Sequence, residues 1–207
     1  MNLSPKLLKS SDPYGGFLHW LSVWRPNPDD PDPEMPGLKQ QMILFIAVKP
    51  EQACLCGSGQ PYGVCCQPKP EWHPICYNPA AEGYSLLAPQ EALFHEVDGP
   101  TLRQRLDADS RLACVEDTPE NAFWILWGDP ALETEYGIIG FGDIELIQNQ
   151  TLLVTAMSDQ RMQALLDLLE EIANDFLGEP EIKRDPPPTL RKPPRPTRRG
   201  LRFGRRK

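Results

Sequence analysis

The sequence has no long hydrophobic run. Its longest apolar stretch, residues 42–48 (MILFIAV), is far too short to span a bilayer. The first ten residues, MNLSPKLLKS, contain neither the apolar stretch nor the small-residue cleavage site of a secretory signal. These absences exclude membrane-spanning and fibrous proteins, and they predict a soluble, cytoplasmic protein without membrane insertion.

Recognisable catalytic and nucleotide-binding motifs are also missing. Gly137, Gly140 and Gly142 fall within an expected strand that no helix follows, so they do not form a phosphate-binding loop. His95 precedes Glu96, but the second histidine of an H-E-x-x-H zinc motif is absent. The sequence therefore favours a non-enzymatic protein, and an enzyme of unidentified reaction is the alternative.

Charge is divided unevenly along the 207 residues. Residues 183–207 contain 11 Lys and Arg against one acid, Asp185, which gives this end a charge of +10. Residues 1–182 contain 10 Lys and Arg against 28 Asp and Glu, which gives −18, and the two parts make the net charge of −8. An acidic body with a basic end predicts a protein that reaches a polyanion through that end.

The basic end is also rich in proline. The six prolines of residues 183–207 exclude a helix and favour an extended backbone with outward arginines. Arginine suits phosphate groups, and Phe203 offers a ring for base stacking. We therefore predict a disordered tail, residues 179–207, that binds RNA or the ribosome; a solubilising tail, or one folding back on the acidic body, is the alternative. The predicted nucleic-acid-binding residues are Arg191, Lys192, Arg195, Arg198, Arg199, Arg202, Phe203, Arg205, Arg206 and Lys207.

Composition also divides the first part of the chain. Residues 1–24 carry scattered large apolar side chains without a clean period, and they predict a short arm packed on the body. Residues 25–37 contain five prolines and four acids, which predicts a linker. Residues 38–83 are expected to hold a buried strand at 42–48 and a cluster of cysteines.

Residues 84–178 predict an α+β domain. A helix is expected at residues 100–106, and strands are expected at 92–97, 112–115, 123–127, 137–147 and 151–157. The last two strands are joined by a tight turn at residues 148–150. Ser158 can cap a following helix whose apolar residues share one face, and Gly178 and Pro180 are expected to end it. The apolar residues of that face are Met162, Leu165, Leu166, Leu169, Ile172, Ala173 and Phe176.

Four of the six cysteines lie in two close pairs within thirteen residues: Cys54 and Cys56, then Cys65 and Cys66. Two such pairs joined by a short turn can supply the four soft ligands of a tetrahedral zinc site. Disulfides within either pair would be strained and would need an oxidising compartment. A redox pair usually has C-x-x-C spacing, which is absent. The spacing therefore predicts structural zinc.

The string CLCGSGQPYGVCC, residues 54–66, resembles the SEC-C motif, C-x-C-G-S-G-x-x-Y-x-x-C followed by Cys or His. In that family the motif is a zinc knuckle, found at the C-terminus of the bacterial preprotein-translocase motor ATPase, where it contacts the export chaperone and the ribosome. The resemblance implies zinc bound by the four cysteines, with a supporting loop of Gly57, Ser58, Gly59 and Tyr62. Many members carry Lys or Arg at the positions of Gln60, Gly63 and Val64.

These observations predict an α+β fold: a small zinc knuckle plus a strand-meander domain closed by a C-terminal helix, with disordered tails. The predicted function is that of a cytoplasmic bacterial zinc-binding adaptor whose basic tail contacts RNA or the ribosome. A protein partner is also possible. Because Gln60, Gly63 and Val64 are uncharged, the tail rather than the knuckle is expected to meet an acidic partner.

Overall fold

The computed structural model describes residues 16–24, 38–78, 83–127, 138–173 and 175–192. The linker predicted at residues 25–37 and the basic residues beyond Lys192 lie outside the described residues. Neither helix in the described ranges is long and apolar enough to cross a membrane.

The described residues form twelve strands and two helices, which confirms the predicted α+β class. In chain order the elements are β1 (Gly16–Trp24), β2 (Leu38–Ala47), β3 (Glu71–Trp72), β4 (Ile75–Asn78), β5 (Gly83–Leu86), β6 (Gln90–Phe94), α1 (Gly99–Ala108), β7 (Leu112–Asp117), β8 (Ala122–Trp127), β9 (Ile138–Ile147), β10 (Thr151–Ala156), α2 (Asp159–Ala173), β11 (Glu181–Arg184) and β12 (Leu190–Arg191).

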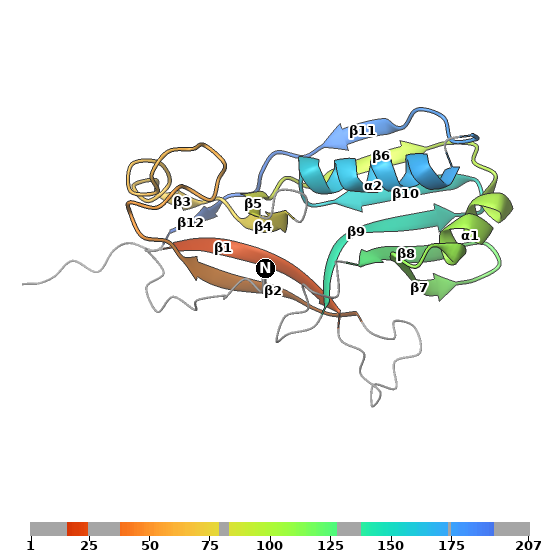
Figure 1. Ribbon diagram of the computed structural model, residues 1–207, viewed down its shortest axis with the longest axis horizontal. Helices are drawn as coiled ribbons and strands as arrows, with labels where there is room; N and C mark the ends of the chain where they lie inside the picture. The colour runs from red at the N-terminus through yellow and green to blue at the C-terminus, as the bar shows by residue number, and fades with distance from the viewer. Residues whose placement is uncertain (1–15, 25–37, 79–82, 128–137, 174, 193–207) are drawn as a thin grey trace, which may run out of the picture.

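Ten of these strands form one large sheet, and β9 joins its two halves. The main strand order is β11-β6-β10-β9-β1-β4-β5, with β2 on β1, and with β8 on β9 followed by β7. Ile138 and Ile139 pair with β1, whereas the later part of β9 pairs with both β8 and β10. Figure 1 shows the resulting bend of β9 between the β1–β2 hairpin and the rest of the sheet. β3 and β12 form a separate two-stranded sheet.

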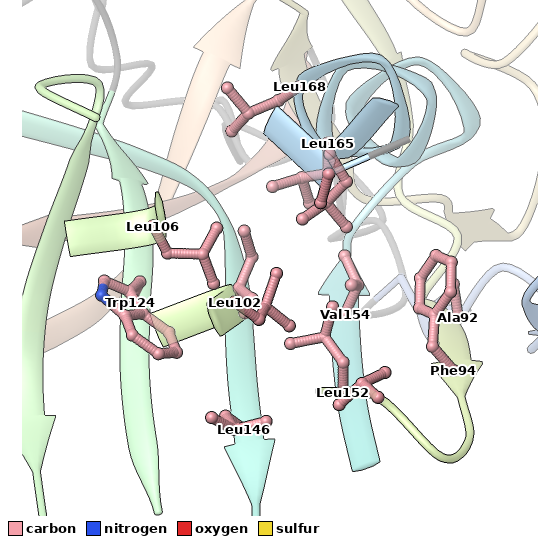
Figure 2. Close-up of a cluster of buried hydrophobic side chains, with 14 of the residues drawn as sticks. Ala92, Phe94, Leu102, Leu106, Trp124, Leu146, Leu152, Val154, Leu165 and Leu168 are labelled. Atoms are coloured by element: carbon pink, nitrogen blue, oxygen red, sulfur yellow. The ribbon is translucent and has the colours of Figure 1, made fainter. Parts of the chain in front are cut away.

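Both helices supply side chains to the larger hydrophobic core. Leu102 and Leu106 of α1, and Leu165 and Leu168 of α2, are buried against the strands. Figure 2 shows these leucines beside Val154 and the other strand residues of the core. The core residues of the strands include Ala92, Phe94, Trp124, Ile144, Leu146, Leu152 and Val154. Both helices thus pack on the strands of this part of the chain.

Helix α2 begins where the sequence predicts. The hydroxyl of Ser158 accepts a hydrogen bond from the backbone N–H of Arg161 at 3.3 Å, as expected of an N-cap. The helix ends at Ala173, earlier than the apolar pattern predicts. The Ala173 carbonyl accepts bonds from the N–H groups of both Phe176 and Leu177, so the chain turns away before it reaches Gly178.

The prediction for the N-terminal segment needs correction. The sequence predicts a short arm packed on the body at residues 1–24, but residues 16–24 form β1 in the middle of the sheet. Gly16 marks one close contact, because a Cβ there would collide with the Ile46 carbonyl oxygen of β2. The hydrophobic pattern does not identify this strand. β1 has neighbours on both edges and lacks the polar and apolar alternation of a half-exposed strand.

The tail prediction also needs correction, since part of residues 179–207 is folded. β11 pairs with β6, and β12 pairs with β3. Every residue of these two short strands is exposed. Backbone hydrogen bonds at open strand edges hold the segment in place, and no hydrophobic pattern is needed for that. The predicted boundary at residue 84 falls within β5, which pairs with β4.

Candidate metal centre

The knuckle, residues 50–67, is shaped by its own backbone hydrogen bonds. The Cys54 N–H donates to the Gln60 carbonyl at 2.8 Å, and the Tyr62 N–H donates to the Gln52 carbonyl at 2.8 Å. These bonds fold the loop back on itself, with Ala53 and Pro61 forming an antiparallel bridge. A short turn after Pro61 then returns the second cysteine pair to the first.

The fold brings the four predicted ligands together. The Sγ atoms of Cys54, Cys56, Cys65 and Cys66 all lie within 4.8 Å of one another. The Sγ atom of Cys65 is 3.6 Å from that of Cys56 and 3.7 Å from that of Cys66. A tetrahedron of sulfurs about 2.3 Å from a central ion has edges of about 3.8 Å. The cluster can therefore hold a metal ion. All six cysteines lie in the described ranges and are free thiols.

Two glycines allow the tight loop between the cysteine pairs. Gly57 has φ of 80° and Gly59 has φ of 72°, a left-handed conformation that costs other residues energy. The Gly57 N–H donates to the Cys54 carbonyl at 3.2 Å. This turn places the Ser58 hydroxyl 3.2 Å from the Sγ atom of Cys65. The supporting loop thus positions both the backbone and a polar group around the sulfurs.

The thiols of Cys54, Cys56 and Cys66 differ in how readily they ionise. Burial raises the pKa of Cys54 to about 11, and it also raises the pKa of Cys66. Burial opposes ionisation of Cys56 as well, but hydrogen bonds from Ser58 and Cys54 lower the pKa of its thiol to about 7. A metal ion must displace the protons of the more buried thiols, so metal affinity rises with pH.

The knuckle packs on the β1–β2 hairpin through a second, smaller core. Tyr62 is 1% exposed, and its hydroxyl donates to the Gly16 carbonyl at 3.1 Å. Its ring centroid lies 5.2 Å from that of Phe17. Cys54 and Cys66 belong to the same buried cluster. Two of the four candidate metal ligands are thus part of the packing between the knuckle and the sheet.

The structure explains why glycine occupies position 63, where many members of the SEC-C family carry Lys or Arg. A Cβ at this position would lie 2.9 Å from the Cβ of Pro50 and 3.0 Å from its carbonyl oxygen. The Gly63 N–H also donates to that oxygen, at 2.8 Å. The close approach to Pro50 leaves no room for a lysine or arginine side chain.

Lys192, predicted only as a nucleic-acid-binding residue, lies against the knuckle. Its Nζ atom donates to the carbonyl oxygens of Cys66 at 3.0 Å and Gln67 at 3.1 Å. Its backbone N–H donates to the Pro70 carbonyl at 2.8 Å. A tail folded back on the body is only an alternative at the level of sequence, and nothing in the sequence identifies this contact.

The other predicted residues lie elsewhere or outside the described part. Arg191 is exposed on β12, next to Lys192. The remaining predicted nucleic-acid-binding residues lie outside the described ranges: Arg195, Arg198, Arg199, Arg202, Phe203, Arg205, Arg206 and Lys207. Cys76 and Cys114 do not join the four-cysteine cluster.

Comparison with known proteins gives no family assignment. No protein-family model matches the chain, and no curated protein or solved structure matches it either.

Proposed function

We propose that this protein is a non-enzymatic zinc-binding adaptor that contacts RNA or the ribosome through its basic C-terminal segment. The observation that carries the proposal is the convergence of four cysteine sulfurs, two of them buried, at one point of the structure. The basic segment leaves the described structure beside this point, at Lys192.

The donor set supports zinc and a structural role. Four thiolates are soft ligands that suit zinc, and with four protein ligands the ion keeps no open position for a substrate. The resemblance of residues 54–66 to the SEC-C motif favours the same metal. Metal analysis of the purified protein should find one zinc per chain. Zinc retained in full after Cys56→Ser with Cys65→Ser would exclude this ligand set, and Cys114→Ser is the matched control.

The charge distribution supports a polyanionic partner. Beyond Lys192 the chain carries seven Lys and Arg and no acid. The phosphates of RNA attract such a segment without sequence preference, whereas residues 1–182, with a charge of −18, repel them. RNA contact is therefore expected through the segment and not through the acidic body.

Removal of residues 193–207 tests the RNA part of the proposal and keeps every residue that the structure describes. The full chain should bind single-stranded RNA at 50 mM salt, and the truncated chain should not. Seven cations predict a loss of affinity of up to about 10³-fold between 50 and 200 mM salt. A chain with residues 193–207 scrambled is the control, because it keeps the charge and should keep the binding. Undiminished binding by the truncated chain would refute the proposal.

A further inference from the structure

The segment after β11 runs from the edge of the main sheet toward the cysteine cluster. We call residues 185–192 the C-terminal strap. It starts where the Asp185 N–H donates to the Pro89 carbonyl at 2.9 Å, and it ends in β12, which pairs with β3. Pro187 and the ligand Cys56 line one hollow of about 350 Å³. Figure 1 shows β11 beside β6 at the edge of the main sheet, and β12 beside β3 near the knuckle.

The strap is tied to the knuckle at a metal ligand. The Lys192 ammonium group donates to the carbonyl oxygens of Cys66 and Gln67, 126 and 125 positions away in the chain. These bonds hold the backbone of the last cysteine in position. Groups that orient the ligands of a metal commonly contribute to metal affinity as well as to geometry.

Charge gives this contact a second effect. Four thiolates around one divalent ion leave the site with a net charge of −2. The Lys192 ammonium places a positive charge beside the last ligand, so the loaded site and the docked lysine attract each other. The partly buried Nζ bonds are screened less by salt than an exposed ion pair would be.

The rest of the strap contributes little burial. Leu190 is the strap's large aliphatic side chain, and it remains 45% exposed. β12 is two residues long and pairs with β3, which is also two residues long. An attachment with so little apolar contact has a small docking free energy, so one additional charged interaction can decide whether the strap is docked.

We propose that metal binding and strap docking are coupled: the loaded site holds the strap through Lys192, and the docked strap strengthens metal binding. Linkage makes the effect reciprocal. Metal loss would then free the strap back to β11. This inference rests on the proposed metal site but not on the proposed RNA contact.

Zinc affinity of the full chain, measured by competition with a chromophoric chelator, tests one direction. Lys192→Met should weaken zinc binding about 10-fold or more. Arg191→Gln is the matched control, because it removes one charge from the same strand and leaves the two Nζ bonds in place. Unchanged affinity in Lys192→Met, or an equal loss in both variants, would overturn the proposal.

Hydrogen exchange of the wild-type chain tests the other direction without any substitution. Chelation of zinc should speed exchange in residues 185–192, while residues 181–184 keep their protection because they pair with β6. Equal protection of the strap with and without zinc would overturn the coupling. A chain that binds zinc with this coupling but binds no RNA would refute the proposed function and leave the inference standing.

Discussion

The described residues form two hydrophobic cores of different composition. The larger one, the body core, joins α1 and α2 to strands β6, β8, β9 and β10, and it is built from leucine, isoleucine, valine, alanine and aromatic side chains. The smaller one, the knuckle core, lies between the knuckle and the β1–β2 hairpin. Its buried members are Phe17, Ile46, Val48, Cys54, Tyr62, Cys66 and Ile75.

The two cores differ in the kind of interaction that stabilises them. The body core is built almost entirely from apolar side chains of two helices and four strands. The knuckle core includes two of the four candidate metal ligands, and the residues around them form turns. A bound metal would offset the entropy of ordering these loops. We therefore expect the two regions to respond differently to the same perturbations.

Metal removal should produce the largest difference between the regions. Structural zinc contributes an apparent 10–16 kcal/mol, on the order of the values known for zinc-finger peptides. Chelation should therefore abolish exchange protection in residues 50–67 and leave residues 152–169 protected. Hydrogen exchange with mass spectrometry measures both regions in one sample. Simultaneous loss of protection in both would show that the body core also depends on the metal.

Truncation in the body core should have the next largest effect. Leu169 is 1% exposed on the buried face of α2, so Leu169→Ala should lower the free energy of unfolding by about 2–5 kcal/mol. Leu166, only partly buried on the same helix, is the control and should lose less. Urea denaturation measures both variants. Equal losses would mean that α2 packs on the sheet by a different face.

Acid should weaken the sheet between the two cores through His19, which is fully buried in β1. Burial, with a contribution from the positive charge of Arg161, lowers the pKa of His19 to about 3. Between about pH 6.5 and 3 the unfolded chain binds a proton that the folded chain does not. Stability is therefore complete above about pH 6.5 and falls by about 1.4 kcal/mol per pH unit below it.

Chemical denaturation at pH 6 and pH 4.5 checks this dependence. His19→Phe keeps an aromatic ring against Tyr84 and removes the titrating group, so its stability should change less over the same interval. Comparison of the two proteins cancels the loss of metal that acid also causes. Parallel curves for the two proteins would assign the acid sensitivity to other groups.

The smallest effect is expected from a single hydroxyl between the knuckle and β1. Tyr62→Phe removes the hydrogen bond to the Gly16 carbonyl and should cost about 0.5–1.5 kcal/mol. The loss should appear in the protection of the knuckle and not in the midpoint of the body. Val64→Ala, at a position 70% exposed in the same loop, should leave stability unchanged. A cost at Val64 as large as that at Tyr62 would contradict this assignment.

Sequence patterns predicted the elements that are formed by interactions between residues close together in the chain. The β9–β10 hairpin was predictable because its turn residues and the alternation of Leu152 and Val154 lie close together in the chain. Gln148 and Asn149 both have positive φ in the turn, with φ of 52° and 54°. The start of α2 was predictable for the same reason, since Ser158 and the helical face are adjacent.

The strands β1, β11 and β12 were not predictable in this way. β1 pairs with β4 and β9, which lie more than 50 positions away in the chain, and nothing in the sequence of β1 identifies these partners. β11 and β12 bury no side chain, because they are held by backbone groups at the edges of β6 and β3. Pairing between distant segments produces no hydrophobic period in the sequence of either segment, so a sequence pattern does not predict it.

The sequence by itself determined the four-cysteine cluster, which is the candidate metal site. The four cysteines lie within thirteen residues, and turns built from Gly57, Gly59 and Pro61 bring them together with little help from the rest of the chain. Only the tertiary structure decided that Lys192 lies on the carbonyl of Cys66. That contact depends on the edge of β6 receiving β11 and on β3 receiving β12, and both arise from the path of the whole chain.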